Sequence, residues 1–278
     1  STTMDSLAQQ FDIEIVPLSG GMVDSGNDMG SESIRFIKPP RVVLLAGDGA
    51  FSLSTGEIWF HLDRELNYPA GLVNVTQMRF FNWNEADVII MPDGNYSFLR
   101  DKDIADQLEN WIRRGGKLIA FEGAVSQLTG LNWIHLKKKE AMSEANNENK
   151  YAPLKKFEER ERSELISHIP GSIYKVSLDN THPLAFGYPE YYYSLKLNSA
   201  FYDFINDSGW NVGVIKGSTE KSGFIGSAVK NSFKDALVFG TENVGRGNVI
   251  YFTDDILFRN FWENGKLMFD NALFLVGQ

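Results

Sequence analysis

Four short apolar runs lie between residues 42 and 121, and each one ends in a turn of polar or glycine residues. They occupy residues 42–46, 71–75, 87–91 and 117–121. A continuous apolar run of this length is typical of a strand covered on both faces, which occurs mainly in parallel sheets. Helical patterns fill the gaps that parallel crossovers require. The first half of the chain is therefore predicted to form βαβ units around a parallel sheet.

Two of these helical patterns carry end signals. Ser54 and Glu57 have the spacing of a capping box, and apolar residues follow at helical spacing as far as Leu66. The second pattern, at 101–114, has acidic residues at its start, two arginines at its end and two glycines beyond it. Both are predicted to be helices that cover the sheet.

The remaining sequence divides by composition. Residues 1–40 are loosely patterned and are expected to form a lead-in segment that packs on the domain. We expect residues 41–278 to form one three-layer α/β domain with a β-rich second half and a closing helix at 258–276. An insertion at about 135–170 contains a charge-dense stretch at 137–164, which is predicted to be a solvated helical excursion or partly disordered.

Composition excludes several functions. The 278 residues include no cysteine, so disulfides, cysteine-ligated metals and a cysteine nucleophile are impossible. The 27 basic and 36 acidic residues give a net charge of -9, which argues against nucleic acid as a partner. No apolar run is long enough to predict a membrane span.

The ends of the predicted strands carry acidic and glycine residues. In open α/β sheets the ligand crevice lies beyond these carboxyl ends, so a pocket for a polar ligand or a cation is expected there. Helix N-caps are the simpler interpretation of any single aspartate. Arg259 either lines the same pocket or pairs with one of the carboxylates to hold the last helix. The candidate pocket residues are Asp48, Asp93, Glu122, Gly123, Asp254, Asp255 and Arg259.

Three further features could indicate a metal site, a nucleophile or a ligand-binding surface. His61 and Glu65 have the i, i+4 spacing of a metal pair, but no third ligand is evident, and such pairs are common on the wet face of a helix. Ser126 lies just beyond the sharp turn after residue 121, without an assignable histidine partner. The aromatic run at 191–193 suits either a ligand platform or a half-buried strand. No catalytic residue and no metal ligand is predicted.

The sequence around this turn resembles the class I glutamine amidotransferase-like superfamily. The segment K-L-I-A-F-E-G-A at 117–124 follows W-I-R-R-G-G at 111–116. The resemblance implies a flavodoxin-like fold with a cysteine at the elbow after this strand and a histidine after a late strand. Gly123 is expected at the elbow, and Asp254 and Asp255 follow the late strand. Neither position is therefore expected to carry the catalytic cysteine or histidine of the superfamily.

A closer resemblance is to the amidotransferase-like domain at the C-terminus of certain bacterial zinc carboxypeptidases. It rests on motifs spread over nearly the whole chain. These motifs are G-N-D-M-G-S at 26–31, P-P-R-V at 39–42, G-E-I-W at 56–59, Y-A-P-L at 151–154, D-x-T-H-P-L-A-F-G-Y at 179–188 and F-R-N-F-W at 258–262.

This resemblance implies an accessory domain of a metalloprotease. A peptidase domain would precede Ser1 and would be the intramolecular partner of this chain. Zinc is expected only in that domain, so no cofactor is expected here, and the location would be periplasmic or secreted. The alternatives are a carbohydrate- or peptide-binding module, and a residual hydrolase that uses Ser126 or the acidic rim.

Overall fold

The computed structural model describes residues 2–17, 19–32, 34, 37–139, 154, 156–217, 219 and 221–277. The chain divides into two compact units, Ser1–Lys38 with Gln278, and Pro39–Gly277. The first unit contains helix α1 (Thr2–Phe11), which is followed by irregular backbone. All features below belong to the second unit.

The four apolar runs form the parallel half of the sheet, as predicted. They are β1 (Val42–Ala46), β2 (Ala70–Asn74), β3 (Val88–Met91) and β4 (Lys117–Phe121). The order is β2-β1-β3-β4, and every neighbouring pair is parallel. Connections run through α2 (Ser52–Phe60) and α3 (Lys102–Arg113), and α4 (Gly123–Leu128) follows β4.

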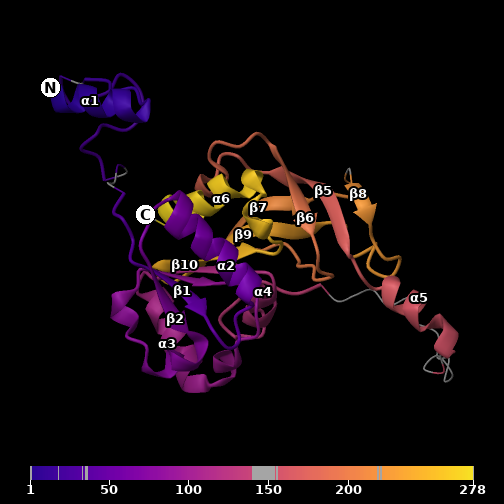
Figure 1. The fold of residues 1–278 in the computed structure, drawn as a ribbon. Helices are drawn as coiled ribbons and strands as arrows, with labels where there is room; N and C mark the ends of the chain where they lie inside the picture. The colour runs from indigo at the N-terminus through magenta and orange to yellow at the C-terminus, as the bar shows by residue number, and fades with distance from the viewer. Residues whose placement is uncertain are drawn as a thin grey trace. The chain divides into compact units, whose positions relative to one another are not determined.

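The β-rich second half extends the same sheet. Strand β10 lies parallel to β4, and the strands beyond it are antiparallel, in the order β10-β9-β7-β5-β6, with β8 pairing with β5. The chain is therefore mixed α/β with a mostly parallel first half (Figure 1). The strands are β5 (Gly171–Leu178), β6 (Tyr191–Lys196), β7 (Gly209–Ile215), β8 (Lys221–Phe224), β9 (Ala236–Val244) and β10 (Gly247–Phe252).

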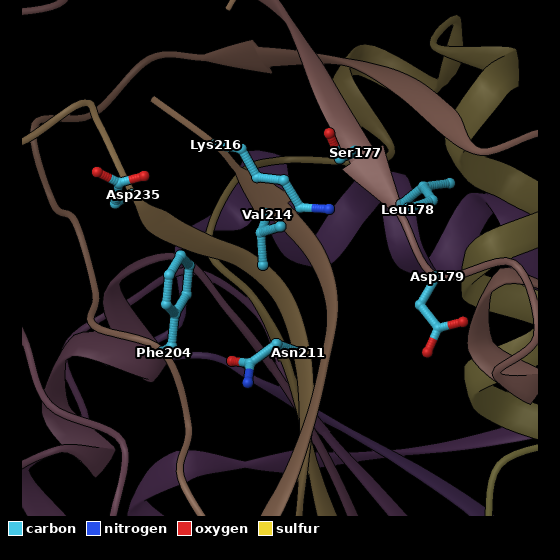
Figure 2. Close-up of a pocket in the computed structure, with 8 residues that line it drawn as sticks. All are labelled: Ser177, Leu178, Asp179, Phe204, Asn211, Val214, Lys216 and Asp235. Carbon is cyan, nitrogen blue, oxygen red and sulfur yellow. The ribbon is translucent and has the colours of Figure 1, made fainter. Parts of the chain in front are cut away.

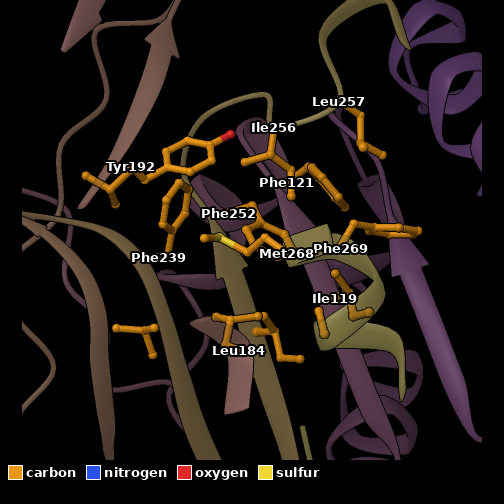
Figure 3. Close-up of a cluster of buried hydrophobic side chains, with 14 of the residues drawn as sticks. Ile119, Phe121, Leu184, Tyr192, Phe239, Phe252, Ile256, Leu257, Met268 and Phe269 are labelled. Atoms are coloured by element: carbon orange, nitrogen blue, oxygen red, sulfur yellow. The ribbon is translucent and has the colours of Figure 1, made fainter. Parts of the chain in front are cut away.

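Two apolar clusters cover the two faces of the sheet. Along β1, Val42 and Leu44 belong to the cluster under α2 and α6 (Glu263–Phe274), whereas Val43 and Leu45 belong to the cluster under α3. This alternation explains why the strand is apolar at every position. Figure 3 shows the first cluster, in which Phe269 of α6 packs beside Phe121 of β4.

Shorter elements complete the chain. Helix α6 confirms the predicted closing helix.

The charged insertion is described only in part. Its helix α5 (Arg160–Leu165) is exposed, whereas residues 140–153 and 155, with most of the Y-A-P-L motif, lie outside the described residues. No described helix has the length and apolarity to cross a membrane. The short turns are the π-helix η1 (His61–Glu65) and the 3-10 helices η2 (Val75–Phe80), η3 (Trp83–Glu85), η4 (Ser97–Arg100), η5 (Phe157–Glu159), η6 (Pro183–Ala185) and η7 (Phe258–Asn260).

The predicted capping box is wrong. Helix α2 begins at Ser52, its N-cap is Phe51, and no side chain caps it. Ser54 and Glu57 instead point into the protein, where both are buried. The hydroxyl of Ser54 accepts a hydrogen bond from the backbone N–H of Asp93 at 3.1 Å. The two residues thus contact the segments that follow β3 and β10 instead of capping the helix.

Candidate functional site

The sharp turn between β4 and α4 forms the centre of the candidate site. Glu122 has φ 42° and ψ -106°, and its N–H extends the pairing of β4 with β10 by donating to the carbonyl of Phe252 at 2.8 Å. This backbone conformation is rare for a residue with a side chain, and it is the arrangement that exposes a nucleophile at a strand-to-helix elbow. The elbow residue is therefore Glu122, and the prediction that placed Gly123 there is off by one residue.

Gly123 has a different role, which is close packing. Its N–H donates to Oδ1 of Asp93 at 2.9 Å. A Cβ at residue 123 would lie 2.4 Å from the same oxygen and 3.1 Å from the carbonyl oxygen of Gly94. Glycine is needed at 123 because Asp93 approaches the backbone, and its φ is not positive.

We expect Gly123→Ala to destabilise the protein by roughly 1–3 kcal/mol, because the added methyl group must displace Asp93. Urea unfolding followed by circular dichroism measures the loss. Gly56→Ala is the matched control, since nothing lies within 4 Å of its Cβ position in the middle of α2. That variant should be neutral or up to about 1 kcal/mol more stable. Equal effects of the two substitutions would contradict the packing role of Gly123.

Asn198 holds the side chain of Glu122. Its Nδ2 donates to Oε1 of Glu122 at 2.8 Å and to the carbonyl oxygen of Thr253 at 3.1 Å. Burial nevertheless raises the pKa of Glu122 to about 8, against the hydrogen bond from Asn198 and with the help of the negative charge of Asp93. Near neutral pH the elbow therefore carries a largely protonated carboxyl group.

Two further carboxyls, Glu57 and Asp255, lie close enough to Glu122 for their charges to act on it or to be affected by it. Glu57 of α2 and Asp255 after β10 are hydrogen-bonded to each other, and Oε2 of Glu57 also accepts from the backbone N–H of Arg259 at 2.9 Å. Burial raises the pKa of Glu57 to about 7, and burial with the charge of Glu57 raises the pKa of Asp255 to about 8. Two adjacent buried carboxyls cannot both ionise at low cost, so the pair shares a proton.

The side chain of Asp254 contacts strands β5 and β6 instead of these carboxyls. It is fully buried, and its Oδ1 lies 2.9 Å from Nζ of Lys196, which is 2 % exposed. Its Oδ2 accepts from Ser194 at 2.7 Å and from the hydroxyl of Tyr174. Three strand residues of the second half thus surround one carboxylate. Asp254 is a structural ion-pair partner and not a residue of the pocket rim.

Two other predicted rim residues also lie apart. Asp48 is exposed in the turn after β1, and within the described part of the chain no hydrogen bond or ion pair joins its side chain to the other carboxylates. The guanidinium of exposed Arg259 lies 5.0 Å from the ring centre of Phe258. Its backbone N–H, and not its side chain, contacts Glu57. The predicted ion pair between Arg259 and a rim carboxylate is therefore wrong.

His61 has a structural setting that the sequence did not indicate. It is buried, with Nδ1 2.5 Å from Glu65 and Nε2 2.8 Å from Asp270 of α6. Burial lowers the pKa of His61, but the hydrogen bonds and charges of Asp270 and Glu65 outweigh burial and raise it. Among the described residues, no group of three or more His, Asp or Glu is placed to hold a metal ion.

We expect the stabilisation by His61 to depend on pH. Because its folded pKa is raised, the contribution is fully present below the unfolded value of about 6.5 and is lost as pH rises through the folded pKa. The difference in unfolding free energy between the protein and His61→Gln should therefore shrink as the pH is raised. Exposed His168 provides the control, since His168→Gln should leave the profile unchanged. A difference that grows with pH would contradict this assignment.

Ser126 lies one helical turn beyond the elbow. Its Oγ accepts from Nζ of Lys138 at 3.2 Å. Within the described part of the chain no histidine bonds to it, since His135 contacts Glu242 and His182 caps its own turn. Among the described residues, Ser126 thus contacts the ammonium of Lys138 and has no imidazole partner.

The partly or fully buried carboxyls of Glu57, Asp93, Glu122 and Asp255 therefore form one cluster at the strand ends. Burial raises the pKa of Asp93 as well, against hydrogen bonds from the N–H groups of Gly123 and Gly94. Partly protonated carboxyls can both donate and accept hydrogen bonds, which suits a polar, uncharged ligand or a proton-sharing structural role. Three of the seven predicted residues (Asp93, Glu122 and Asp255) contribute carboxyls to this cluster, and the N–H of Gly123 donates to Asp93.

Comparisons with known proteins add the fold relationship. No family model matches the sequence, and no curated protein matches it. Solved structures do match, at low identity. PurLQS from Thermotoga maritima is 12% identical with a TM-score of 0.53, covering 85% of this chain and 98% of that chain. A ThuA-like protein from Parabacteroides merdae is 12% identical with a TM-score of 0.53, covering 84% and 89%. A glutamine amidotransferase from Thermotoga maritima is 8% identical with a TM-score of 0.50, covering 85% and 97%.

The chain has a glutamine amidotransferase-like fold. Identities of 8–12% establish the fold alone. The predicted fold class is confirmed. Within this fold the elbow after β4 carries a glutamate, in a sequence without cysteine.

Sequence reasoning missed Glu57 and Asn198. Glu57 was assigned to a helix cap, although its place beside Ile58 in an apolar helix was a signal of burial. Asn198 follows β6 and reaches Glu122, 76 residues earlier in the chain. No local pattern marks such a contact.

Proposed function

We propose that this chain is a non-catalytic amidotransferase-like domain that serves as a structural, regulatory or ligand-binding accessory domain of a bacterial zinc carboxypeptidase acting in the periplasm or outside the cell. The observation that carries the non-catalytic part is Glu122 at the elbow. In a thiol amidotransferase a nucleophile would occupy this turn, whereas here the position holds a carboxyl fixed by Asn198.

Glu122 is a poor substitute nucleophile for a physical reason. A carboxyl attacks only as the carboxylate, and with a pKa of about 8 the group is mostly protonated near neutral pH. The charges that act on it come from Asp93, Asp255 and Asp254, all of which favour its protonated form. The resemblance places a catalytic histidine after β10, where this chain has Asp254 and Asp255. Asp254 forms a buried ion pair with Lys196 and is not available to act as a base.

The accessory role draws support from an exposed apolar surface beside the edge strand β2. Leu53, Trp59 and Leu72 are exposed, and the last two line a hollow of about 400 Å³ between α2 and β2. Parallel edge strands are normally covered, because they present unpaired backbone groups. A peptidase domain packed here would cover both the edge and the apolar side chains.

The first test is to determine the coding sequence upstream of Ser1. A peptidase domain with a His-x-x-Glu zinc motif is expected, and its absence would refute the accessory role. In the full polypeptide, Leu72→Lys should then loosen the two domains, measured as increased protease sensitivity between them. Leu165→Lys, on exposed α5, is the matched control.

The second test concerns catalysis by the chain itself. We expect no hydrolysis of glutamine or of 4-nitrophenyl acetate above the level of the Ser126→Ala and Glu122→Gln variants. Hydrolysis by the unaltered chain that either substitution abolishes would contradict the non-catalytic assignment and would favour a residual hydrolase.

A further inference from the structure

A hollow lined by both polar and apolar residues opens on the second half of the sheet. It has a volume of about 380 Å³ and lies where β5 and β7 diverge. The two strands pair only at Ser177 and Leu178 of β5, and β8 replaces β7 along the start of β5. Its lining residues are Ser177, Leu178, Asp179, Phe204, Asn211, Val214, Lys216 and Asp235 (Figure 2). None of them belongs to the carboxyl cluster around Glu122.

The floor of this hollow is formed by buried Val214, and Phe204, which is 41% exposed, forms an aromatic wall. Leu178 borders the hollow, but its side chain packs into the apolar cluster on the opposite face of the sheet. Figure 2 shows Phe204 to the left of Val214, Asn211 below it and Asp179 to the right. Asn211 is committed to the fold, because its amide bonds to the backbone N–H and carbonyl of Ile205, both at 2.7 Å. It therefore fixes the loop that carries Phe204.

The charged and hydroxyl groups keep unused bonding capacity. Oδ1 of Asp179 accepts from Thr181, and Oδ1 of Asp235 accepts from the N–H of Gly217 at 2.8 Å. Within the described part of the chain, the second oxygen of each carboxylate has no hydrogen bond, and the same holds for the Lys216 ammonium and the Ser177 hydroxyl. Figure 2 shows the Lys216 side chain crossing above Val214 with its nitrogen on the side of Ser177.

We propose that this hollow binds a neutral saccharide. A pyranose presents hydroxyl groups that donate and accept at once, which matches two carboxylate acceptors beside one ammonium and one hydroxyl donor. Its C–H face is apolar and fits the Phe204 ring and the Val214 floor. Two carboxylates against one ammonium disfavour an anion, and the central position of Lys216 disfavours a cation.

The strand arrangement favours a saccharide over a peptide. An extended peptide commonly binds by adding a strand to a free sheet edge. Here β5 lies between β6 and the β7–β8 side, and β7 lies between β9 and β5. Both are interior strands, so the hollow offers side chains and not an open backbone edge.

The neighbouring face of the sheet extends the site for longer chains. Tyr191 of β6 is the register partner of Ser177, and Tyr193 is the partner of Lys175. Side chains of paired residues lie on the same face, so both tyrosines continue the surface from the hollow. They are 45% and 40% exposed, whereas Tyr192 between them is buried. The aromatic run is thus both a half-buried strand and an exposed aromatic surface, which we assign to further sugar units.

The test is calorimetric titration of the chain with glucose, galactose, mannose, N-acetylglucosamine and their β-linked disaccharides and trisaccharides. We expect at least one series to bind, and Phe204→Ala and Lys216→Met each to weaken it about tenfold or more. Tyr191→Ala should weaken the trisaccharide more than the monosaccharide. Phe80→Ala and Lys230→Met, at exposed positions outside the hollow, are the matched controls.

Three outcomes would overturn the proposal. They are the absence of binding by every saccharide, binding that Phe204→Ala and Lys216→Met leave unchanged, and binding of a tripeptide panel at this site without any saccharide. Unchanged circular dichroism spectra would show that the variants are folded, which is expected because both side chains are exposed. The result does not depend on the upstream peptidase domain, so failure here and failure of the accessory role are distinguishable.

Discussion

Asp254→Ala is expected to destabilise the protein by about 3–5 kcal/mol, because it leaves the ammonium of Lys196 buried without its counter-charge. Among the described residues, the Lys196 ammonium would then contact only Oδ1 of Asn198 at 3.0 Å and the ring of Phe201 at 4.8 Å. Tyr174 and Ser194 would lose their acceptor as well. Urea unfolding at neutral pH measures the loss.

The double variant Asp254→Leu with Lys196→Met separates the charge effect from packing. It should recover part of the loss, since it removes both buried charges. Exposed Glu158, paired with Lys156 at 3.5 Å, is the matched surface control, and Glu158→Gln should change stability by less than about 1 kcal/mol. A loss for Asp254→Ala as small as that of the surface control would contradict the burial of this pair.

Glu122→Gln is expected to stabilise the protein at alkaline pH. The folded state keeps the Glu122 proton up to about pH 8, whereas the unfolded chain releases it near 4.5. Between these values the folded state binds more protons, so the stability of the unaltered protein falls as pH rises. Glutamine is neutral throughout and can still accept from Asn198.

The gain from Glu122→Gln should be near zero at about pH 5 and about 2–4 kcal/mol at about pH 9. Urea unfolding at a series of pH values measures it. Glu190 is exposed, so Glu190→Gln is the control and should show no such trend. A gain that is independent of pH would mean that Glu122 is ionised in the folded protein across the range.

Sequence patterns predicted the sheet better than the site. Strands buried on both faces must be apolar at almost every position, so β1, β3 and β4 were visible as runs, and α3 was visible from its apolar face and end residues. Edge strand β2 is partly exposed, but its short apolar run was visible as well. The second half was harder to assign, because whether its strands join the same sheet depends on the pairing of β10 with β4. That pairing joins residues 130 positions or more apart.

The elbow was misplaced by one residue. The resemblance to the amidotransferase-like superfamily put it at Gly123, and no local pattern marks a glutamate for a positive φ, which is more usual for glycine. The structure gives the positive φ to Glu122 and uses Gly123 to admit Asp93. Asp254 and Asp255 could not be separated either, because one faces Lys196 and the other Glu57, and both partners lie far away in the sequence.

In place of a nucleophile, the elbow holds the carboxyl group of Glu122, which stays protonated at neutral pH. The most direct measurement is the titration of Glu122 itself, by carboxyl ¹³C NMR of the labelled protein, with Glu122→Gln identifying its resonance. A midpoint near 8 is expected from the burial of Glu122. A midpoint near the ordinary glutamate value of about 4.3 would contradict the claim, because Glu122 would then be a solvated carboxylate.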